Sequence, residues 1–170
     1  MSLNFITKED YDKLKLLDRE YYFDARWKYI EEVINIIKDT NIQFNNCIEL
    51  GAYLFSIAKE QDTIDILSKS NPTYLMDANI TPWSIKKKYD LFIGLQVLEH
   101  LKNKTEICNE IKKISNYAVI SLPYKWNCKD INNCHHMIDE EVIYSWFKIE
   151  PKYTKIQEYR IINFYEFKSS

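Results

Sequence analysis

The sequence predicts an α/β fold, with a mostly parallel sheet of about six to seven strands, helices on both faces and an antiparallel strand at the C-terminal edge. Two observations support this prediction. Short apolar runs typical of buried strands alternate along the chain with segments of helical periodicity, which favours parallel strands joined by crossover helices. The C-terminal stretch from Ile149 to Phe167 instead contains two extended segments around Glu158, which indicates a closing hairpin.

The length and composition fit one globular domain. The chain has 170 residues, of which 46% are hydrophobic and 28% charged, and no stretch is rich enough in Pro, Gly or Ser to mark a linker. We therefore predict a single domain over residues 1–170. Its N-terminal helices, at 1–42, form a candidate lid, and residues 43–170 form the α/β core.

The N-terminal part is predicted to be helical. Thr7 can cap a helix that begins at Lys8. Further along, apolar residues recur at three- and four-residue spacing, which is typical of one buried helix face: Trp27, Ile30, Val33, Ile34 and Ile37. We expect this face to pack on the core.

Strand and helix patterns then alternate. Residues 46–50 and 90–95 are apolar and predict strands, and residues 96–101 follow the second strand at helical spacing. Thr105 is the predicted cap of a helix that carries Ile107, Ile111 and Ile114, and residues 117–122 predict a buried strand. Asp139 is predicted to begin a last short helix before the hairpin.

Charge and composition exclude several classes of function. A formal net charge of −2 gives no field that would attract DNA, RNA or an acidic membrane, so we expect neither nucleic acid nor membrane as a partner. Four cysteines are too few for a disulfide scaffold, and we find no secretory signal, so we expect a cytoplasmic protein with reduced thiols. Only 2 glycines occur, which disfavours a nicotinamide dehydrogenase, because its G-x-G-x-x-G turn needs three.

Three segments lie where strands are predicted to end, which is where open α/β sheets bind ligands. They are Cys47-Ile-Glu-Leu-Gly-Ala-Tyr-Leu-Phe55, residues 89–101 with their Tyr-Asp strand and Leu-Glu-His-Leu sequence, and residues 118–126 with a strand that ends near Pro123. Together they resemble the class I S-adenosylmethionine-dependent methyltransferases over roughly residues 47–167. The resemblance implies a Rossmann-like fold and S-adenosylmethionine as cofactor.

The resemblance also implies a set of cofactor-binding residues. Glu49 and Gly51 stand where the family has its acidic residue and first glycine, and Leu95 and Gln96 lie where the family lays the chain against the cofactor. Asp65 resembles the acidic residue that accepts the ribose hydroxyls, and Asp77 the one beside adenine, although either aspartate is equally typical of a turn or cap. The full implied set is Glu49, Gly51, Ala52, Asp65, Asp77, Ala78, Leu95 and Gln96.

The first loop departs from the family. Tyr53 and Phe55 occupy the next two glycine positions, and a left-handed backbone at a non-glycine residue costs about 1–2 kcal/mol. The distance from Gly51 to Asp65 also leaves little room for a full crossover helix. Two alternatives follow, a reshaped loop that binds the cofactor and a loop that binds it weakly.

The catalytic candidates are His136, His100 and Tyr124. His136, in the loop of residues 124–139, is the preferred base because it resembles a histidine of related small methyltransferases, and the imidazole of His100 can also deprotonate an acceptor. The Glu99-His100 pair has two interpretations. In some relatives such a pair lies near bound metal or substrate, but a glutamate in a first helical turn also favours the helix dipole, and for Glu99 we favour this structural interpretation. The same loop holds Cys128, Cys134, His135 and His136, a composition that suits zinc, but the paired cysteine spacing of structural zinc sites is absent and we assign no metal ligand.

Aromatic residues and one arginine of the N-terminal part have two interpretations. Tyr21, Tyr22, Arg26 and Trp27 either form a lid over the site or, as aromatic residues at helical spacing more often do, belong to the core.

These features predict a methyltransferase that acts on a small-molecule or sugar-like acceptor. In-line methyl transfer depends chiefly on positioning the acceptor and the methyl group, which can lower the activation barrier by about 7–11 kcal/mol. The first alternative is a non-catalytic protein that keeps the fold as a binding or scaffold module, and the second is a metal-dependent hydrolase or metal-binding domain. The sequence assigns no oligomeric state.

Overall fold

A seven-stranded sheet forms the centre of the computed structural model, which describes residues 3–130 and 132–167. The strands are β1 (Cys47–Leu50), β2 (Asp62–Asp65), β3 (Tyr74–Leu75), β4 (Tyr89–Leu95), β5 (Ser115–Pro123), β6 (Tyr153–Gln157) and β7 (Arg160–Glu166). Within the described ranges the helices are α1 (Lys8–Lys15), α2 (Asp24–Asp39), α3 (Lys104–Ile114) and α4 (Glu140–Phe147), with 3₁₀ turns η1 (Ser68–Ser70) and η2 (Leu98–His100).

The order of strands in the sheet is β3-β2-β1-β4-β5-β7-β6. All pairs from β3 to β5 are parallel, whereas β7 is antiparallel to both β5 and β6. This confirms the predicted α/β class and its antiparallel C-terminal edge. The β6–β7 hairpin turns at Glu158 (φ 55°), with β6 as the edge strand and β7 inside the sheet.

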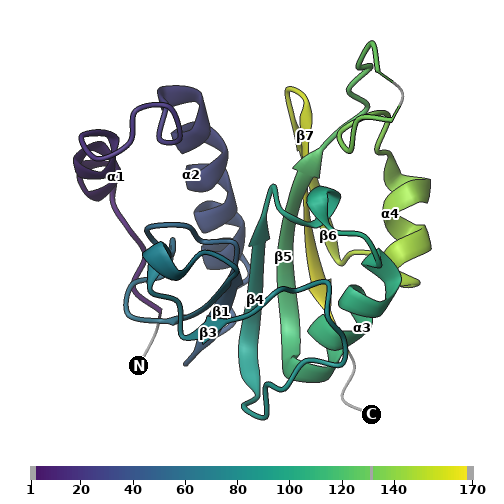
Figure 1. The fold of residues 1–170 in the computed structure, drawn as a ribbon, viewed down its shortest axis with the longest axis horizontal. Helices are drawn as coiled ribbons and strands as arrows, with labels where there is room; N and C mark the ends of the chain where they lie inside the picture. The colour runs from purple at the N-terminus through teal and green to yellow at the C-terminus, as the bar shows by residue number, and fades with distance from the viewer. Residues whose placement is uncertain (1–2, 131, 168–170) are drawn as a thin grey trace.

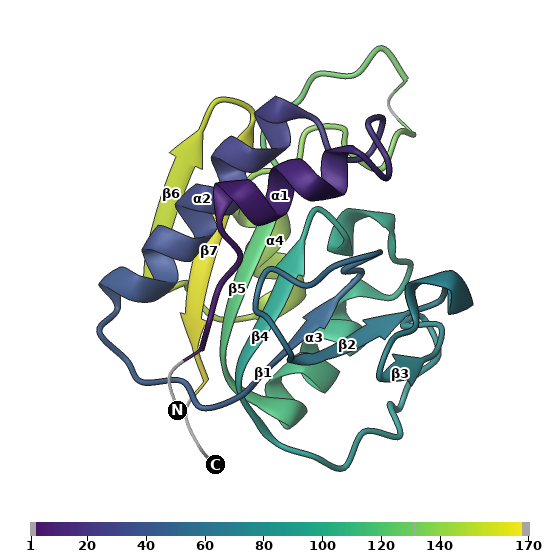
Figure 2. The same ribbon diagram turned by 90° about the vertical axis from the view of Figure 1, so that its left-hand side faces the viewer.

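Helices cover both faces of the sheet, with α1 and α2 on one side and α3 and α4 on the other (Figures 1 and 2). Strand β4 shows how the core divides, because Leu91 and Ile93 pack with the residues of α2 while Phe92 packs with those of α3 and α4. The predicted apolar face of α2 is buried throughout. Neighbouring residues of a strand point to opposite faces, so an apolar run buries both sides.

Two of the predicted helix caps are confirmed and one is wrong. Thr7 forms a capping box with Asp10, and Asp139 accepts a hydrogen bond from the amide of Val142. Thr105 is not a cap, because the carbonyl of Asn103 already accepts the amide of Ile107, which makes Asn103 the cap residue.

The helical pattern predicted at 96–101 is only the 3₁₀ turn η2. Gln96 has a left-handed backbone (φ 53°), which a right-handed helix cannot include. Glu99 therefore lies in a single 3₁₀ turn, and the longer helix whose dipole it was expected to favour does not form.

The connection between β1 and β2 contains no helix in the structure, as its short length predicts. Instead, the N-terminal segment lies beside it. The amide of Ile6 donates to the carbonyl of Ile57 (3.0 Å), the amide of Lys59 donates to the carbonyl of Asn4 (2.7 Å), and Phe5 pairs with Ala58 in a β-bridge. Residues 4–6 thus support the connection in place of a helix.

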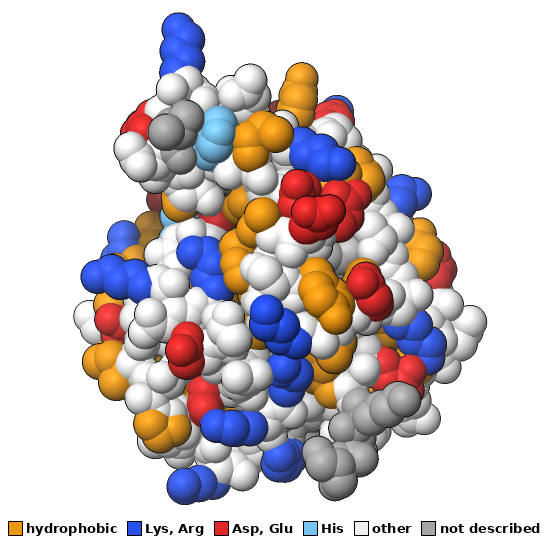
Figure 3. Space-filling view, turned by 90° about the vertical axis from the view of Figure 1, so that its right-hand side faces the viewer, with side chains coloured by type: hydrophobic (Ala, Val, Ile, Leu, Met, Phe, Trp, Pro, Cys, Tyr) orange, Lys and Arg blue, Asp and Glu red, His pale blue; other side chains and the backbone are white. Residues whose placement is uncertain are grey.

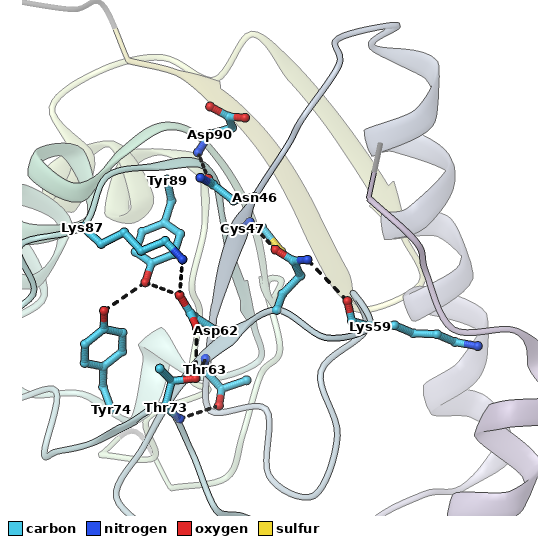
Figure 4. A network of polar contacts seen from close by, with 11 residues as sticks. Asn46, Cys47, Lys59, Asp62, Thr63, Thr73, Tyr74, Lys87, Tyr89 and Asp90 are labelled. Atoms are coloured by element: carbon cyan, nitrogen blue, oxygen red, sulfur yellow. Dashed lines mark hydrogen bonds and ion pairs between the residues drawn. The ribbon is translucent and has the colours of Figure 1, made fainter. Parts of the chain in front are cut away.

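A polar network ties the strands together at their amino-terminal ends (Figure 4). The carboxylate of Asp62 accepts hydrogen bonds from Lys87 (2.7 Å) and from the hydroxyl of Tyr89 (2.7 Å). Between β1 and β4, the side chain of Asn46 accepts the amide of Asp90 at 2.7 Å. Burial alone would raise the pKa of Asp62, but the hydrogen bonds from Lys87 and Tyr89 lower it below its ordinary value. This end of the sheet is occupied by structural contacts.

None of the helices in the described residues has the length and apolar character that a membrane crossing requires. All four cysteines are free thiols, and Cys47 and Cys108 are buried.

Candidate functional site

A pocket of about 400 Å³ opens at the carboxyl ends of β1, β2 and β4. This is the edge at which open α/β sheets bind ligands, and the volume falls within the about 300–1,000 Å³ of small-molecule sites. Several residues that the sequence predicts line the pocket: Gly51, Asp65, Leu95, Gln96 and His100. The structure therefore brings these residues together around one cavity.

Gly51 follows β1 at a position that strongly favours glycine. Its backbone is left-handed (φ 69°), and a Cβ atom there would lie 2.8 Å from Cγ2 of Val97. Its amide donates to the carbonyl of Ile64 in β2 at 2.8 Å. The chain after β1 is thus held close to β2 and to the turn after β4, and the pocket floor is formed by backbone.

Asp65 ends β2 and is 8% exposed. Its carboxylate accepts the amide of Tyr53 at 3.1 Å and the amide of Leu67 at 2.9 Å. The structural role that the sequence left open is therefore present. Because a carboxylate has about four acceptor positions, these two bonds leave room for hydroxyl donors of a ligand.

Tyr53 carries the strain expected of a residue in a glycine position. It is left-handed (φ 56°). Its hydroxyl donates to Asp18 (3.2 Å) and accepts from Lys69 (3.0 Å), and its ring centroid lies 4.5 Å from that of Tyr21. The ring forms one wall of the pocket, whereas Phe55 lines a separate neighbouring cavity of about 20 Å³. The space beside Gly51 therefore stays open despite both aromatic substitutions.

Gln96 is fixed at the end of β4. Its amide donates to the carbonyl of Ser121 at 2.9 Å, and its side-chain Nε2 donates to the hydroxyl of the same serine at 2.9 Å. These bonds to β5 hold the left-handed backbone of Gln96 at the pocket wall. Residues in such sparsely populated conformations are frequent at functional sites.

Glu49 and Ala52 lie behind the pocket, in the wall of the 20 Å³ cavity. Glu49 is 3% exposed, and its Oε2 accepts the hydroxyl of Ser56 (2.7 Å) and the amide of Ile57 (2.8 Å). Burial raises the pKa of this carboxyl group to about 7, although both donors and Arg26 act in the opposite direction. In this position Glu49 shapes the loop that carries the pocket.

Two arginines, Arg26 and Arg160, line the pocket. The sequence analysis did not predict that they lie there together. The guanidinium of Arg26 donates to the hydroxyl of Tyr21 (2.9 Å) and lies 4.0 Å from the centre of that ring. The guanidinium of Arg160 lies 4.7 Å from the ring centre of Tyr29, and its buried Nε has no hydrogen-bond partner. Among the described residues neither arginine forms a salt bridge, so both charges are available to an anionic group.

The candidate lid divides between site and core. Tyr21 and Arg26 line the pocket, whereas Tyr22 and Trp27 are buried in the core (4% and 8% exposed). The sequence analysis did not predict that Arg160 lies in the pocket, and the only feature of the sequence that points to it is the scarcity of arginine. The chain has three arginines among many lysines, and two of the three line this pocket.

Glu99, His100 and His135 form the far side of the pocket. Nε2 of His135 lies 3.4 Å from Nε2 of His100, and Oε1 of Glu99 lies 3.9 Å from the same nitrogen. Burial raises the pKa of Glu99 to about 7. Burial and the neighbouring His135 lower the pKa of His100, so its imidazole is neutral at neutral pH and can accept a proton.

The remaining predicted residues lie outside the lining of this pocket. Asp77 accepts the amide and side chain of Asn79 (both 2.9 Å), and Trp83 donates to the carbonyl of Ala78. Tyr124 donates to Glu140 at 2.6 Å. All three contacts are those of loop and helix-end residues.

His136 also lies outside the pocket lining, while its neighbour His135 is part of it. His136 forms an isolated β-bridge with Trp126 within a series of turns, and its buried Nδ1 has no hydrogen-bond partner among the described residues. Of the two adjacent histidines, only His135 lines the cavity.

Comparison with solved structures shows the fold of class I S-adenosylmethionine-dependent methyltransferases. The N-methyltransferase NodS from Bradyrhizobium japonicum, in complex with S-adenosyl-L-homocysteine, matches with a TM-score of 0.60 at 12% identity, over 84% of this chain and 87% of that chain. A methyltransferase from Clostridium acetobutylicum matches with a TM-score of 0.61 at 9% identity, over 95% and 99%.

A third match is the magnesium protoporphyrin IX methyltransferase from Synechocystis with bound S-adenosylmethionine. Its TM-score is 0.57 at 15% identity, over 83% of this chain and 80% of that chain. No protein-family model and no curated protein sequence matches the chain. At such low identities the likeness establishes the fold, and function has to be argued from the site.

Proposed function

We propose that this protein is an S-adenosylmethionine-dependent methyltransferase that acts on a small-molecule or sugar-like acceptor. One observation supports the proposal above all. The pocket lies at the carboxyl ends of β1, β2 and β4 in a sheet of the methyltransferase strand order, and it stays open at Gly51 despite Tyr53.

The residues around the pocket fit the cofactor. Asp65 has spare acceptor positions for ribose hydroxyls. The guanidinium of Arg26 donates to the hydroxyl of Tyr21 and forms no salt bridge among the described residues, so it suits the carboxylate of the amino-acid end. Leu95 and Gln96 supply a wall at the end of β4. When bound, the cofactor supplies an activated methyl group on a sulfonium centre.

The chain's own part in the reaction is to position the acceptor and to exclude water. Tyr21, Tyr29 and Tyr53 give the pocket aromatic walls on the side of α2. His100 and His135 lie on the opposite side of the pocket, where they can contact an acceptor. In this proposal His135, and not the predicted His136, is the loop histidine that faces the acceptor.

The aromatic and arginine residues before β1 belong to the same proposal. Tyr21 and Arg26, in and just before α2, cover the pocket as part of a lid formed by residues 1–42 on the core of residues 43–170. A small-molecule acceptor without nucleic acid or a membrane as partner, and a cytoplasmic location, remain predictions from composition and charge.

Calorimetric titration with S-adenosylhomocysteine tests the proposal. We expect binding in the wild type, and weaker binding in Asp65→Asn and Arg26→Gln. Asp77→Asn is the matched control, because its side chain does not line the pocket. Absence of heat and of thermal stabilisation at millimolar ligand would refute the proposed function and leave the fold unaffected.

A second candidate is a non-catalytic protein that retains the fold to bind a ligand or partner. The left-handed Tyr53 favours it, because a side chain now occupies a wall that glycine would leave to the cofactor. The variant Tyr53→Gly distinguishes the two. An enzyme should bind S-adenosylhomocysteine in both forms, whereas a binding module should bind it only after the substitution or in neither form.

A further inference from the structure

A histidine–cysteine cluster lies where the loop of residues 124–139 meets η2. One ligand atom from each of His100, Cys134 and His135 can be chosen so that all lie within 4.8 Å of one another. The nearest approaches are 3.4 Å between Sγ of Cys134 and Nδ1 of His100, and 3.4 Å between the Nε2 atoms of His100 and His135. Figure 3 shows that this loop projects as a lobe from the body of the molecule.

These distances are close to those of a metal centre. With Zn–N about 2.0–2.1 Å and Zn–S about 2.3 Å, two donors of a tetrahedral zinc ion lie about 3.3–3.6 Å apart. One ion binds only one of the two ring nitrogens of His100, so either 3.4 Å contact can be kept as it stands. The third donor atom, which lies within 4.8 Å of the others, then has to move by up to about 1.2 Å to complete the set. Cys134 and His100 are exposed, so an ion can reach them from solvent.

Glu99 provides a second and independent observation. It is 1% exposed, it lines the pocket, and neither of its carboxylate oxygens has a hydrogen-bond partner in the described residues. A buried carboxyl group without a partner is unfavourable, whereas a cation beside it supplies the missing interaction. Its Oε1 lies 3.9 Å from Nε2 of His100, on the pocket side of the cluster.

We propose that His100, Cys134 and His135 bind a divalent transition-metal ion, with zinc favoured by its donors, and that Glu99 lies beside the open coordination position. Two imidazoles and a thiolate suit zinc rather than magnesium or calcium, which take oxygen ligands. Three protein ligands with a fourth position open to a cavity are typical of zinc sites that bind a water or substrate.

The loop holds the ligands in place. The ring of His135 stacks on that of Trp126, with the planes parallel and the centroids 5.6 Å apart. Its amide donates to the side chain of Asn133 at 2.9 Å. Stacking fixes the ring plane and directs Nε2 towards His100, as outer contacts of a metal ligand usually do.

The site differs from the one that the sequence analysis weighed and set aside. That hypothesis joined Cys128 and His136 to Cys134 and His135, which are near in sequence. The fold instead brings in His100 from η2, which is distant in sequence, and His136 is not part of the cluster. The spacing rule that argued against a metal does not apply to ligands from separate segments.

Metal binding is tested on the full chain, stripped with chelator and titrated with Zn²⁺ and with Co²⁺. We expect about one ion per chain and a cobalt–thiolate charge-transfer band in the near ultraviolet. Cys134→Ser should abolish that band, and His100→Ala and His135→Asn should each weaken the affinity by about 100-fold or more. Cys128→Ser and His136→Asn are the matched controls and should leave both measurements unchanged.

The proposal is overturned if the stripped wild type takes up no ion at micromolar metal, or if Cys134→Ser keeps the charge-transfer band. It is also overturned if the two control variants lose the ion as fully as the three proposed ligands do. Urea unfolding of each variant checks that the fold is retained. If His100→Ala fails to fold, His100→Gln takes its place. The metal titrations need neither cofactor nor turnover, so their result is independent of the proposed methyl transfer.

Discussion

The substitution Glu49→Gln should change how the stability of this protein depends on pH. Glu49 is 3% exposed, and burial raises its pKa from 4.5 to about 7. In the unfolded chain the group ionises near its ordinary value. Between these two values the folded protein therefore retains a proton that the unfolded chain has lost.

The sign follows from proton linkage. Because the folded state binds more protons, the free energy of unfolding falls as the pH rises from about 4.5 through about 7. A tenfold change in an ionisation constant corresponds to about 1.4 kcal/mol, so the full effect is about 3 kcal/mol, of which most is lost between pH 5 and pH 8. Glutamine keeps an oxygen that accepts from Ser56 and Ile57 and has no charge to desolvate.

Urea unfolding at pH 5, 6, 7 and 8, followed by tryptophan fluorescence, measures the effect. Relative to Glu49→Gln, the wild type should lose about 2–3 kcal/mol across this range. Glu31→Gln, on the exposed side of α2, serves as the control and should follow the wild type. Parallel profiles for wild type and Glu49→Gln would refute the reasoning and would mean that Arg26 compensates the buried charge.

Three further predictions concern the pocket and its frame. Asp65→Asn should weaken S-adenosylhomocysteine binding by about tenfold in calorimetry, since a charged acceptor becomes neutral, and Asp77→Asn should leave it unchanged. Gly51→Ala should lower the free energy of unfolding by about 1–3 kcal/mol, because its backbone is left-handed and a Cβ would lie 2.8 Å from a valine carbon. Gly94→Ala, whose closest contact is 3.2 Å to a side-chain end, should cost less in the same urea assay. Asp139→Ala should remove the cap of α4 and about 1 kcal/mol of stability, and an unchanged urea midpoint would contradict that role.

Local patterns predicted the frame of the molecule well because each depends on neighbouring residues. The cap at Thr7, the buried face of α2 and the turn at Glu158 are all confirmed. The strand ends were also placed closely enough to bring Gly51 and Asp65 to one pocket. The carboxyl ends of parallel strands lie at the same edge of a sheet, so residues predicted at those ends are also predicted to lie near one another.

The rest of the site depends on contacts between distant segments, which spacing does not encode. Arg160 reaches the pocket only because β7 is inserted between β5 and β6 with its first residue at the carboxyl edge. The choice between His135 and His136 depends on how the loop folds, because His135 stacks on Trp126 and lines the pocket whereas His136 does not line it. The helix expected from residues 96–101 failed at the left-handed Gln96, where tertiary bonds to Ser121 override helical periodicity.

The bonds from residues 4–6 to the connection after β1 have a practical consequence for the choice of expression vector. An affinity tag fused directly ahead of this segment would be attached to the backbone that steadies the chain behind Gly51, and a deletion up to Thr7 would remove that backbone altogether. Ligand titrations should therefore use protein whose tag has been cleaved from the amino terminus or attached at the other end. A truncated protein with weakened ligand affinity would then indicate loss of these backbone contacts and not a defect in a binding residue.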